Sequence, residues 1–184
     1  KIYIDGRDLW ADPEKIRDFR FLTGLVFQYP EYQLFEETVI KDIMFGPKNM
    51  GLSDEEALKR AKEAAHFTDL KPELLEKSPF ELSGGEKRMA ALATVLALEP
   101  TLLALDEPTA FLDPRARRTL INCLKGLDTA MLIATHDLTF AAQVCPRAVL
   151  LREGRVFADG PCRELLYDPA LMEACGVEAI GADG

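Results

Sequence analysis

Residues 101–137, TLLALDEPTAFLDPRARRTLINCLKGLDTAMLIATHD, decide the fold of this chain. Two short apolar runs, Thr101–Leu105 and Thr129–Thr135, predict buried strands. Pro114–Leu127 lies between them and predicts a helix, because it carries a proline at its first turn. Strand, helix and strand within about 35 residues form a βαβ unit, whose two strands run parallel. The sequence therefore predicts an α/β protein with a parallel sheet.

Candidate catalytic side chains follow both predicted strands. Asp106 and Glu107 end the first strand, and His136 ends the second. A right-handed crossover brings the carboxyl ends of parallel strands to one edge, where open α/β sheets bind ligands. Two carboxylates and a histidine suit a divalent cation and the activation of a water molecule. The alternative is that Asp-Glu-Pro caps a helix and that His136 is a structural loop residue.

A second candidate site opens the helix predicted over Ser83–Leu98. Its residues are Leu82-Ser83-Gly84-Gly85-Glu86, in which Ser83 and Glu86 have the spacing of a capping box. A capping box does not need two glycines, which weaken the first turn of a helix. Glycines there leave the free N–H groups and the positive end of the helix dipole open to an anion. The alternative is a flexible entry loop.

Further strands and helices are predicted around these two sites. Residues 1–9 alternate apolar and polar and then reach Asp-Gly, which predicts a half-buried strand that ends in a turn, and Gly24–Gln28 predicts a second, buried strand. The segment from 31 to 98 is mainly helical in pattern. The other predicted elements are helices over Asp12–Phe19, Thr38–Phe45 (stopped by Gly46-Pro47), Ser53–Ala65 and Asp137–Val144, a loop over 68–81, a hairpin of Arg147–Arg152 and Arg155–Asp159, two short helices in 161–177, and a frayed tail over Glu178–Gly184.

Composition excludes several classes of function. The 184 residues include 22 basic and 31 acidic side chains, a net charge of −9, so we expect no nucleic-acid partner. The longest nearly apolar run, Met89–Leu98, is far shorter than the roughly 20 residues that cross a bilayer as a helix. The four cysteines lack metal-ligand or redox-motif spacing and predict scattered reduced thiols.

Five motifs in one order resemble the ATP-binding-cassette (ABC) ATPases. Leu82–Glu86 resembles the signature motif of that family, and Leu102–Glu107 its Walker B strand with the catalytic glutamate. Gln28 resembles the Q-loop glutamine, Ala110–Asp113 the D-loop and His136 the switch histidine. The resemblance runs from residue 1 to about 165. It implies a P-loop-type α/β core with an inserted helical subdomain.

The resemblance also implies roles for these residues, with ATP and Mg²⁺ as the ligands. Asp106 and Gln28 would hold Mg²⁺, Glu107 would polarise the attacking water, and His136 would contact the γ-phosphate. The signature residues would bind the ATP of an opposite subunit in a head-to-tail homodimer or heterodimer. These signature residues are Ser83, Gly84, Gly85 and Glu86, and Asp113 would lie at the seam between the subunits.

Within that family, Phe27–Asn49 and Glu76–Glu86 resemble the ATPase subunits of energy-coupling-factor importers, which take up cobalt, nickel or vitamins. The resemblance implies an integral-membrane transporter partner and a peripheral position on the cytoplasmic face of the cell membrane. Two alternatives stay open. One is an ATPase of another ABC importer class, and the other is a non-catalytic subunit that acts as a dimerisation module.

The family's phosphate-binding loop, Gly-x-x-x-x-Gly-Lys-Ser/Thr, does not occur in these 184 residues. Three explanations are open: a fragment of a longer subunit, which a start at Lys1 favours, a segment outside the resolved part of the protein, or a naturally degenerate subunit. We therefore expect one incomplete domain, with an α/β core of 1–30 and 99–184 and a helical subdomain of 31–98. We also expect the 184 residues alone to bind ATP poorly and to hydrolyse almost none.

Aromatic residues concentrate near the Q-loop glutamine. Seven of the 15 in the chain lie between Phe19 and Phe45. They form either the core between two lobes or a groove that receives a helix of the membrane partner, since exposed aromatics concentrate at interfaces.

Overall fold

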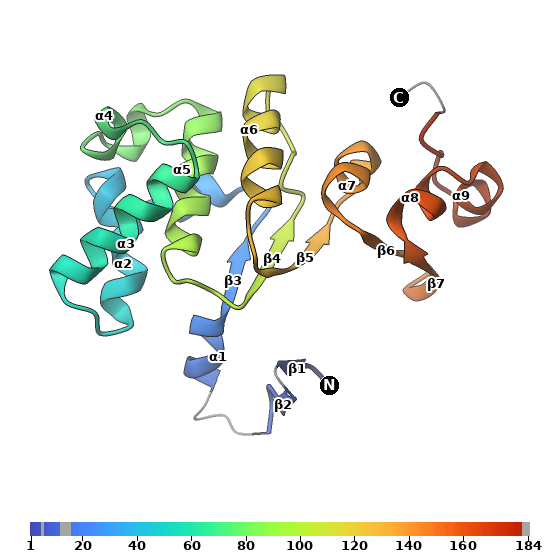
Figure 1. The fold of residues 1–184 in the computed structure, drawn as a ribbon, viewed down its shortest axis with the longest axis horizontal. Coiled ribbons are helices and arrows are strands. Elements are labelled where there is room, and N and C mark those ends of the chain that lie inside the picture. Colours follow the sequence, from blue (N-terminus) through green and yellow to red (C-terminus); the bar gives the residue numbers. More distant parts are fainter. Residues whose placement is uncertain (5, 12–15, 182–184) are drawn as a thin grey trace. The chain divides into compact units, whose positions relative to one another are not determined.

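The computed structural model describes residues 1–4, 6–11 and 16–181, drawn in Figure 1. The chain divides into two compact units, Lys1–Ala134 and Thr135–Gly184. None of the described helices is both long and apolar enough to cross a membrane.

The first unit is built on a sheet of three parallel strands, β3 (Thr23–Val26), β4 (Leu102–Asp106) and β5 (Ala130–Ala134), in that spatial order (Figure 1). Helix α6 (Pro114–Lys125) connects β4 to β5, so the predicted βαβ unit is confirmed. The side chains of Leu103 and Leu105 in β4 are buried. Their burial explains why this strand reads as an unbroken apolar run.

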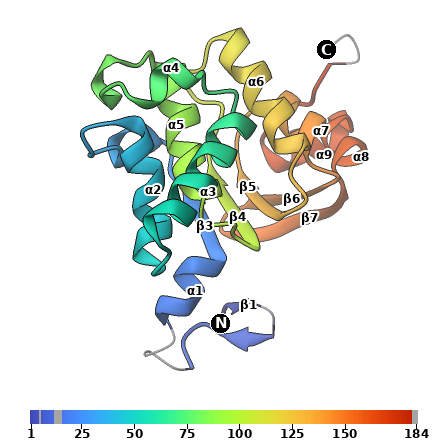
Figure 2. The same cartoon turned by 60° about the vertical axis from the view of Figure 1, so that its left-hand side comes forward.

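Four helices are inserted between β3 and β4 (Figure 2). They are α2 (Val39–Asn49), α3 (Asp54–Phe67), α4 (Pro72–Leu75) and α5 (Gly84–Leu96), with the short 3₁₀ helices η2 (Pro30–Gln33) and η3 (Pro79–Glu81) before and between them. Helix α5 packs against α2, α3 and β3. Its alanine-rich surface lets these elements approach closely, and Gly24 of β3 is required because a Cβ there would lie 2.4 Å from Cγ1 of Val95.

The prediction that Gly46-Pro47 ends a helix is wrong, because α2 continues through Pro47 to Asn49. A proline inside a helix removes one hydrogen bond. Here Pro47 is fully buried, and the backbone N–H of Met50 donates to the carbonyl oxygens of Gly46 and Pro47. Burial and this C-terminal capping offset the lost bond within the last turn.

The amino terminus also differs from its prediction. The single strand predicted over residues 1–9 is an antiparallel pair, β1 (Tyr3–Ile4) and β2 (Arg7–Asp8), connected through Gly6 at φ 73°. Helix α1 (Ile16–Leu22) follows. The helix predicted over Asp12–Phe19 lies partly outside the described residues.

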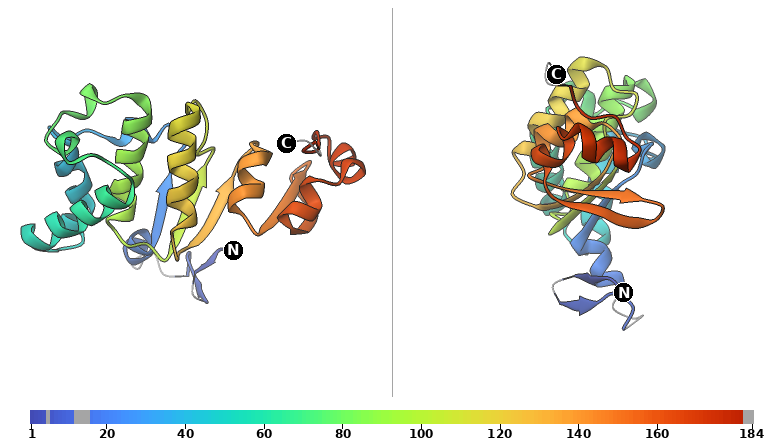
Figure 3. Two further views of the ribbon diagram at one scale, coloured as in Figure 1. Left: turned by 45° about the horizontal axis from the view of Figure 1, so that its top comes forward. Right: turned by 90° about the vertical axis from the view of Figure 1, so that its right-hand side faces the viewer.

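The second unit combines α7 (Leu138–Val144), the antiparallel hairpin β6 (Arg147–Arg152) and β7 (Arg155–Pro161), and the helices α8 (Cys162–Leu166) and α9 (Pro169–Cys175), as Figure 3 shows. Its core holds Ala141, Ala142, Cys162, Leu166, Met172 and Ile180.

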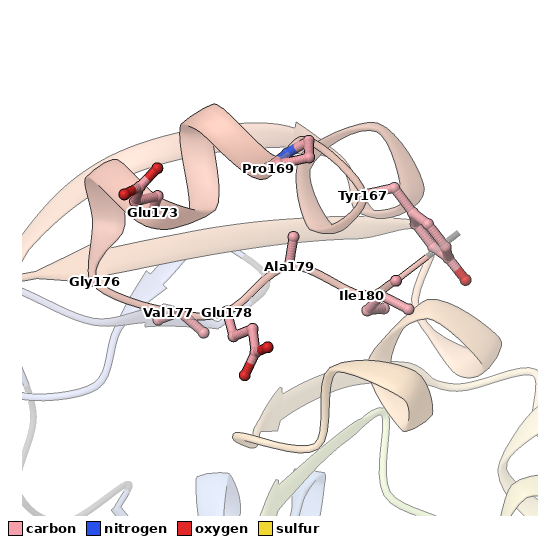
Figure 4. A pocket seen from close by; sticks show the side chains of 9 residues that line it. Tyr167, Pro169, Glu173, Gly176, Val177, Glu178, Ala179 and Ile180 are labelled. Carbon is pink, nitrogen blue, oxygen red and sulfur yellow. The ribbon is translucent and has the colours of Figure 1, made fainter. Parts of the chain in front are cut away.

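The frayed tail predicted after residue 177 is wrong for its described part. Ile180 is buried in that core, and its backbone N–H donates to the carbonyl oxygen of Leu166 at 3.0 Å. An open hollow of about 810 Å³ lies beside this segment, with Tyr167, Pro169 and Glu173 on its rim and Val177–Ile180 along one wall (Figure 4).

Candidate functional site

Three predicted site residues lie at the carboxyl edge of the parallel sheet in the first unit. Asp106 is the last residue of β4, Glu107 follows it, and Gln28 stands two residues beyond the end of β3. Asp106 is exposed, while Glu107 and Gln28 are half-buried. Since β3 and β4 are parallel neighbours, Gln28 and the two carboxylates share one sheet edge. His136 belongs to the second unit, two residues beyond the end of β5.

The backbone of Glu107 adopts an unusual conformation, with φ at +45°. Its N–H donates to the carbonyl oxygen of Ala134 at 2.9 Å, and its own carbonyl accepts from the N–H of Ala110 at 3.1 Å. A left-handed backbone at a residue other than glycine costs on the order of 1 kcal/mol and occurs often at functional sites. The surrounding hydrogen bonds hold Glu107 in this conformation.

Sequence reasoning missed Arg88, a buried arginine in α5. Its side chain is 4% exposed, and its guanidinium donates to the carbonyl oxygens of Gln28 at 2.9 Å and Pro108 at 3.1 Å. It therefore connects the segments that follow β3 and β4. The signal that could have found it is a basic residue placed directly before the longest apolar run of the chain, Met89–Leu98.

The amino terminus of α5 begins with the predicted capping box, which is confirmed. Ser83 donates its hydroxyl to Oε2 of Glu86 at 2.7 Å and its backbone N–H to the same oxygen at 2.8 Å. The N–H of Glu86 donates back to Oγ of Ser83 at 3.4 Å. The hydrogen bonds from Ser83 lower the pKa of the Glu86 carboxyl. Ser83 and Glu86 thus have a structural role, whatever else they do.

The two glycines of this turn have different surroundings. A Cβ at Gly85 would lie 3.0 Å from Cβ of Ala116 in α6, so the packing of α5 on α6 accounts for Gly85. A Cβ at Gly84 would meet no atom within 4 Å, and its φ lies outside the left-handed region. Packing and backbone conformation therefore leave Gly84 unexplained. Open space at a helix N-terminus, where the first N–H groups have no intrahelical acceptor, favours the approach of an anion.

Asp113 is the N-cap of α6. Its Oδ1 accepts the N–H groups of Arg115 at 2.8 Å and Ala116 at 2.9 Å. Nearby, Phe111 has φ at +60° and is 83% exposed, and its ring stacks on Tyr29 with the centroids 5.8 Å apart. The segment before α6 therefore lies against the residue that follows Gln28.

The aromatic cluster near Gln28 is mostly at the surface. Tyr32 is 83% exposed and Phe35 is 60% exposed. The rings of Phe35 and Phe45 meet edge to face at 4.8 Å, and those of Tyr29 and Tyr32 lie 6.0 Å apart. For these four residues the core hypothesis is wrong, whereas Phe19 is buried.

Asp42 of α2 fixes the loop that carries Phe35. Its Oδ1 accepts the N–H groups of Phe35 at 3.0 Å and Glu36 at 3.1 Å. Its Oδ2 is buried without a hydrogen-bond partner among the described residues. Burial raises the pKa of the Asp42 carboxyl, although the two N–H donors act in the opposite direction.

A pH dependence of stability follows from Asp42. Its native pKa is raised, so the folded state binds this proton more tightly than the unfolded state, whose pKa is about 4. Ionisation of the Asp42 carboxyl therefore lowers the free energy of unfolding as the pH rises above that value. Compared with Asp42→Asn, the wild-type chain should become relatively more stable as the pH is lowered from 7 to 4.5. Urea unfolding at both values measures this, with the exposed Asp128→Asn as control. If the difference in the free energy of unfolding between wild type and Asp42→Asn were the same at both pH values, this prediction would be wrong.

Comparisons with known proteins give consistent results. The sequence profile described as "ABC transporter" matches residues 1–110. The energy-coupling factor transporter ATP-binding protein EcfA2 of Caldanaerobacter subterraneus subsp. tengcongensis is 42% identical over 181 residues, which are 96% of this chain. EcfA2 of Bacillus cereus is 46% identical over 171 residues, covering 90% of this chain and 58% of that protein. The chain spans 63% of the length of the Caldanaerobacter protein.

Two solved structures share the fold. CbiO1 from Clostridium perfringens, described as part of the ABC transporter complex cbiONQ, matches with a TM-score of 0.82 and 34% identity over 94% of this chain and 70% of that one. A dimeric ATP-binding cassette, MJ0796, bound to ADP and Pi, matches with a TM-score of 0.75 and 27% identity over 87% of this chain and 72% of that one.

The fold matches that of ATP-binding cassettes, with a parallel sheet and helices inserted between two of its strands. With the profile match over residues 1–110, the chain belongs to the ABC transporter family. Its resemblance to the energy-coupling-factor ATPases is likewise confirmed by its relatives.

Proposed function

We propose that this chain is the ATP-hydrolysing part of a subunit that powers an energy-coupling-factor importer. The observation that carries the proposal is the arrangement at the sheet edge, where Asp106 and Glu107 end β4 beside the Gln28 segment. The EcfA2 proteins and CbiO1 to which the chain is similar support the importer class. Cobalt, nickel or a vitamin is then the class of cargo, bound by a separate membrane subunit.

ATP with Mg²⁺ is the substrate in this proposal, and the donors present fit both. Asp106 is an exposed carboxylate, of the oxygen type that Mg²⁺ prefers, and Gln28 adds an amide oxygen. The cation supplies neutralisation of phosphate charge. Glu107 orients and polarises the attacking water, and His136 contacts the γ-phosphate. Because the transition state of phosphoryl transfer is loose, positioning and electrostatics supply most of the rate enhancement.

The α5 N-terminus serves a second ATP, which belongs to an opposite subunit of the same or a different kind. Ser83 and Glu86 hold the first turn in place, while Gly84 leaves its N–H groups accessible to the γ-phosphate. Asp113 and the D-loop lie at the seam of that pair. The resemblance to a dimeric cassette supports this arrangement.

The exposed aromatic residues after Gln28 bind the membrane partner, which places the chain on the cytoplasmic face of the membrane. Tyr32 in η2 and Phe35 between η2 and α2 offer large exposed aromatic surface. Exposed aromatic clusters of this kind act as anchors in protein interfaces. Gln28 lies between the sheet edge and this surface, so nucleotide state and partner contact are linked through one loop.

Alanine at Tyr32 or Phe35 should lower transport by about tenfold or more in the assembled importer, because interface anchors carry most of the binding energy. ATP hydrolysis should change much less, since neither side chain lies at the sheet edge. Uptake by proteoliposomes and phosphate release measure the two activities. Trp10→Ala, which removes another exposed aromatic, is the control. Equal losses of transport and ATP hydrolysis would contradict the proposal that Tyr32 and Phe35 bind the membrane partner.

Copurification tests the importer class. The assembled protein should copurify with a small integral-membrane scaffold and a cargo-binding membrane subunit. A stable complex with a different type of permease would assign it to another ABC importer class.

A further inference from the structure

Arg88 is a buried cation at the meeting point of three functional segments. It lies in α5, five residues after the N-cap Ser83, and its side chain is 4% exposed. Nη2 donates to the carbonyl oxygen of Gln28 at 2.9 Å. Nη1 donates to the carbonyl oxygen of Pro108 at 3.1 Å and, more weakly, to that of Glu107 at 3.5 Å.

The burial of this charge needs a reason. An ionised side chain is costly to bury unless it is hydrogen-bonded, and the positions that follow, Met89–Ala93, are apolar and buried. A leucine at position 88 would bury without that cost. The planar guanidinium holds its donors on separate nitrogens in fixed directions, whereas the three donors of a lysine share one rotatable nitrogen. Arg88 needs such fixed, divergent donors, because its acceptor oxygens belong to two different loops, one after β3 and one after β4.

One of the two loops that Arg88 connects, the segment after β4, carries strained backbone. Glu107 at φ +45° and Phe111 at φ +60° are both in the left-handed region. The N–H of Glu107 is bound to Ala134, and its carbonyl faces Arg88. The stacked rings of Tyr29 and Phe111 join the same two loops a second time. The position of the Glu107 carboxylate therefore depends on contacts on both sides of its residue.

We propose that Arg88 is a positioning residue that holds Gln28 and Glu107 in one geometry and couples both to the α5 N-terminus. This inference rests on the proposed function. One rigid helix then carries Ser83 and Gly84, which bind the ATP of the opposite subunit, and the guanidinium that orients the hydrolytic residues of its own site. Phosphate binding at one ATP site is thereby transmitted to the catalytic carboxylate of the other.

The Arg88→Lys variant tests the role, because it keeps the charge and much of the volume but not the divergent donors. In the assembled transporter, kcat for ATP hydrolysis should fall by about tenfold or more, as expected for a misplaced catalytic group. KM for ATP should stay within about twofold, and the Hill coefficient for ATP should fall towards one. Arg155→Lys, at an exposed position of β7, is the matched control and should leave all three unchanged.

Hydrogen exchange in the same assembly without nucleotide separates positioning from loss of folding. Peptides covering 26–30 and 106–112 should exchange faster in Arg88→Lys, while α3, at Asp54–Phe67, keeps its wild-type rate. A kcat within twofold of wild type, or faster exchange throughout the helices, would overturn the proposal. If the wild-type assembly hydrolyses no ATP, the proposed function fails, and unchanged exchange in both loops would then refute the role of Arg88 separately.

Discussion

Replacing Glu107 by glutamine should lower ATP hydrolysis in the assembled transporter by about 10²–10⁴-fold, the range that a positioned general base contributes. Glutamine keeps the shape and can still accept a hydrogen bond, but it cannot take a proton from the attacking water. The backbone of Glu107 is fixed by Ala134 and Ala110, so the variant should fold normally. Phosphate release under saturating Mg-ATP measures the loss, and ATP binding should persist.

Glu63→Gln is the matched control for this change, because Glu63 is an exposed glutamate of α3. It should leave hydrolysis within about twofold of wild type, as surface substitutions usually do. The result also separates the proposed enzyme from a non-catalytic dimerisation module. Hydrolysis that survives Glu107→Gln would show that the partner subunit does the chemistry, and this chain would then be the module.

Replacing Gly84 by aspartate should strongly lower ATP hydrolysis, while the stability of the folded protein stays constant or rises. A side chain at this position meets open space, so no packing is disturbed. An acidic residue in the first turn of a helix interacts favourably with the helix dipole, and glycine is a poor helix former. The same carboxylate would repel the γ-phosphate of the opposite subunit. We therefore expect a loss of about 10²-fold or more in phosphate release, comparable to removal of a preorganised anion donor.

Gly84→Ala provides the control, because it adds a methyl group without charge. It should stabilise the helix by about 0.5–1 kcal/mol and lower hydrolysis less than aspartate does. Thermal unfolding and phosphate release, measured on the same preparations, compare the two effects. The view that Gly84 makes room for a bound anion would be contradicted if either variant were less stable than wild type. Wild-type hydrolysis by Gly84→Asp would also contradict it.

Local sequence signals predicted most of the first unit. The Thr101–Thr135 pattern predicted the parallel β4–α6–β5 unit, because apolar runs and a proline at a helix start are local features. The capping box at Ser83 was likewise predicted, because it depends only on a serine and a glutamate three residues apart. Asp106 and Glu107 could be placed because a parallel strand has a defined carboxyl edge.

The features that were missed depend on contacts distant in sequence. Arg88 donates to carbonyl oxygens 60 and 20 residues away, at Gln28 and Pro108. Every residue has a backbone carbonyl, so the residue types in the sequence do not reveal such acceptors. Asp42 binds backbone N–H groups six and seven residues earlier. Helix α2 continued past Pro47 because tertiary burial outweighed the local cost of a proline.

The central claim is that Glu107 takes part in the hydrolysis of one ATP while the α5 N-terminus at Gly84 binds another. Retention of ATP by the assembled transporter tests this claim most directly. Radiolabelled ATP should remain bound through gel filtration in Glu107→Gln, because the nucleotide is held but not hydrolysed. Adding Gly84→Asp to that variant should release it. Equal retention by the single and double variants, or none by either, would contradict this account of the site.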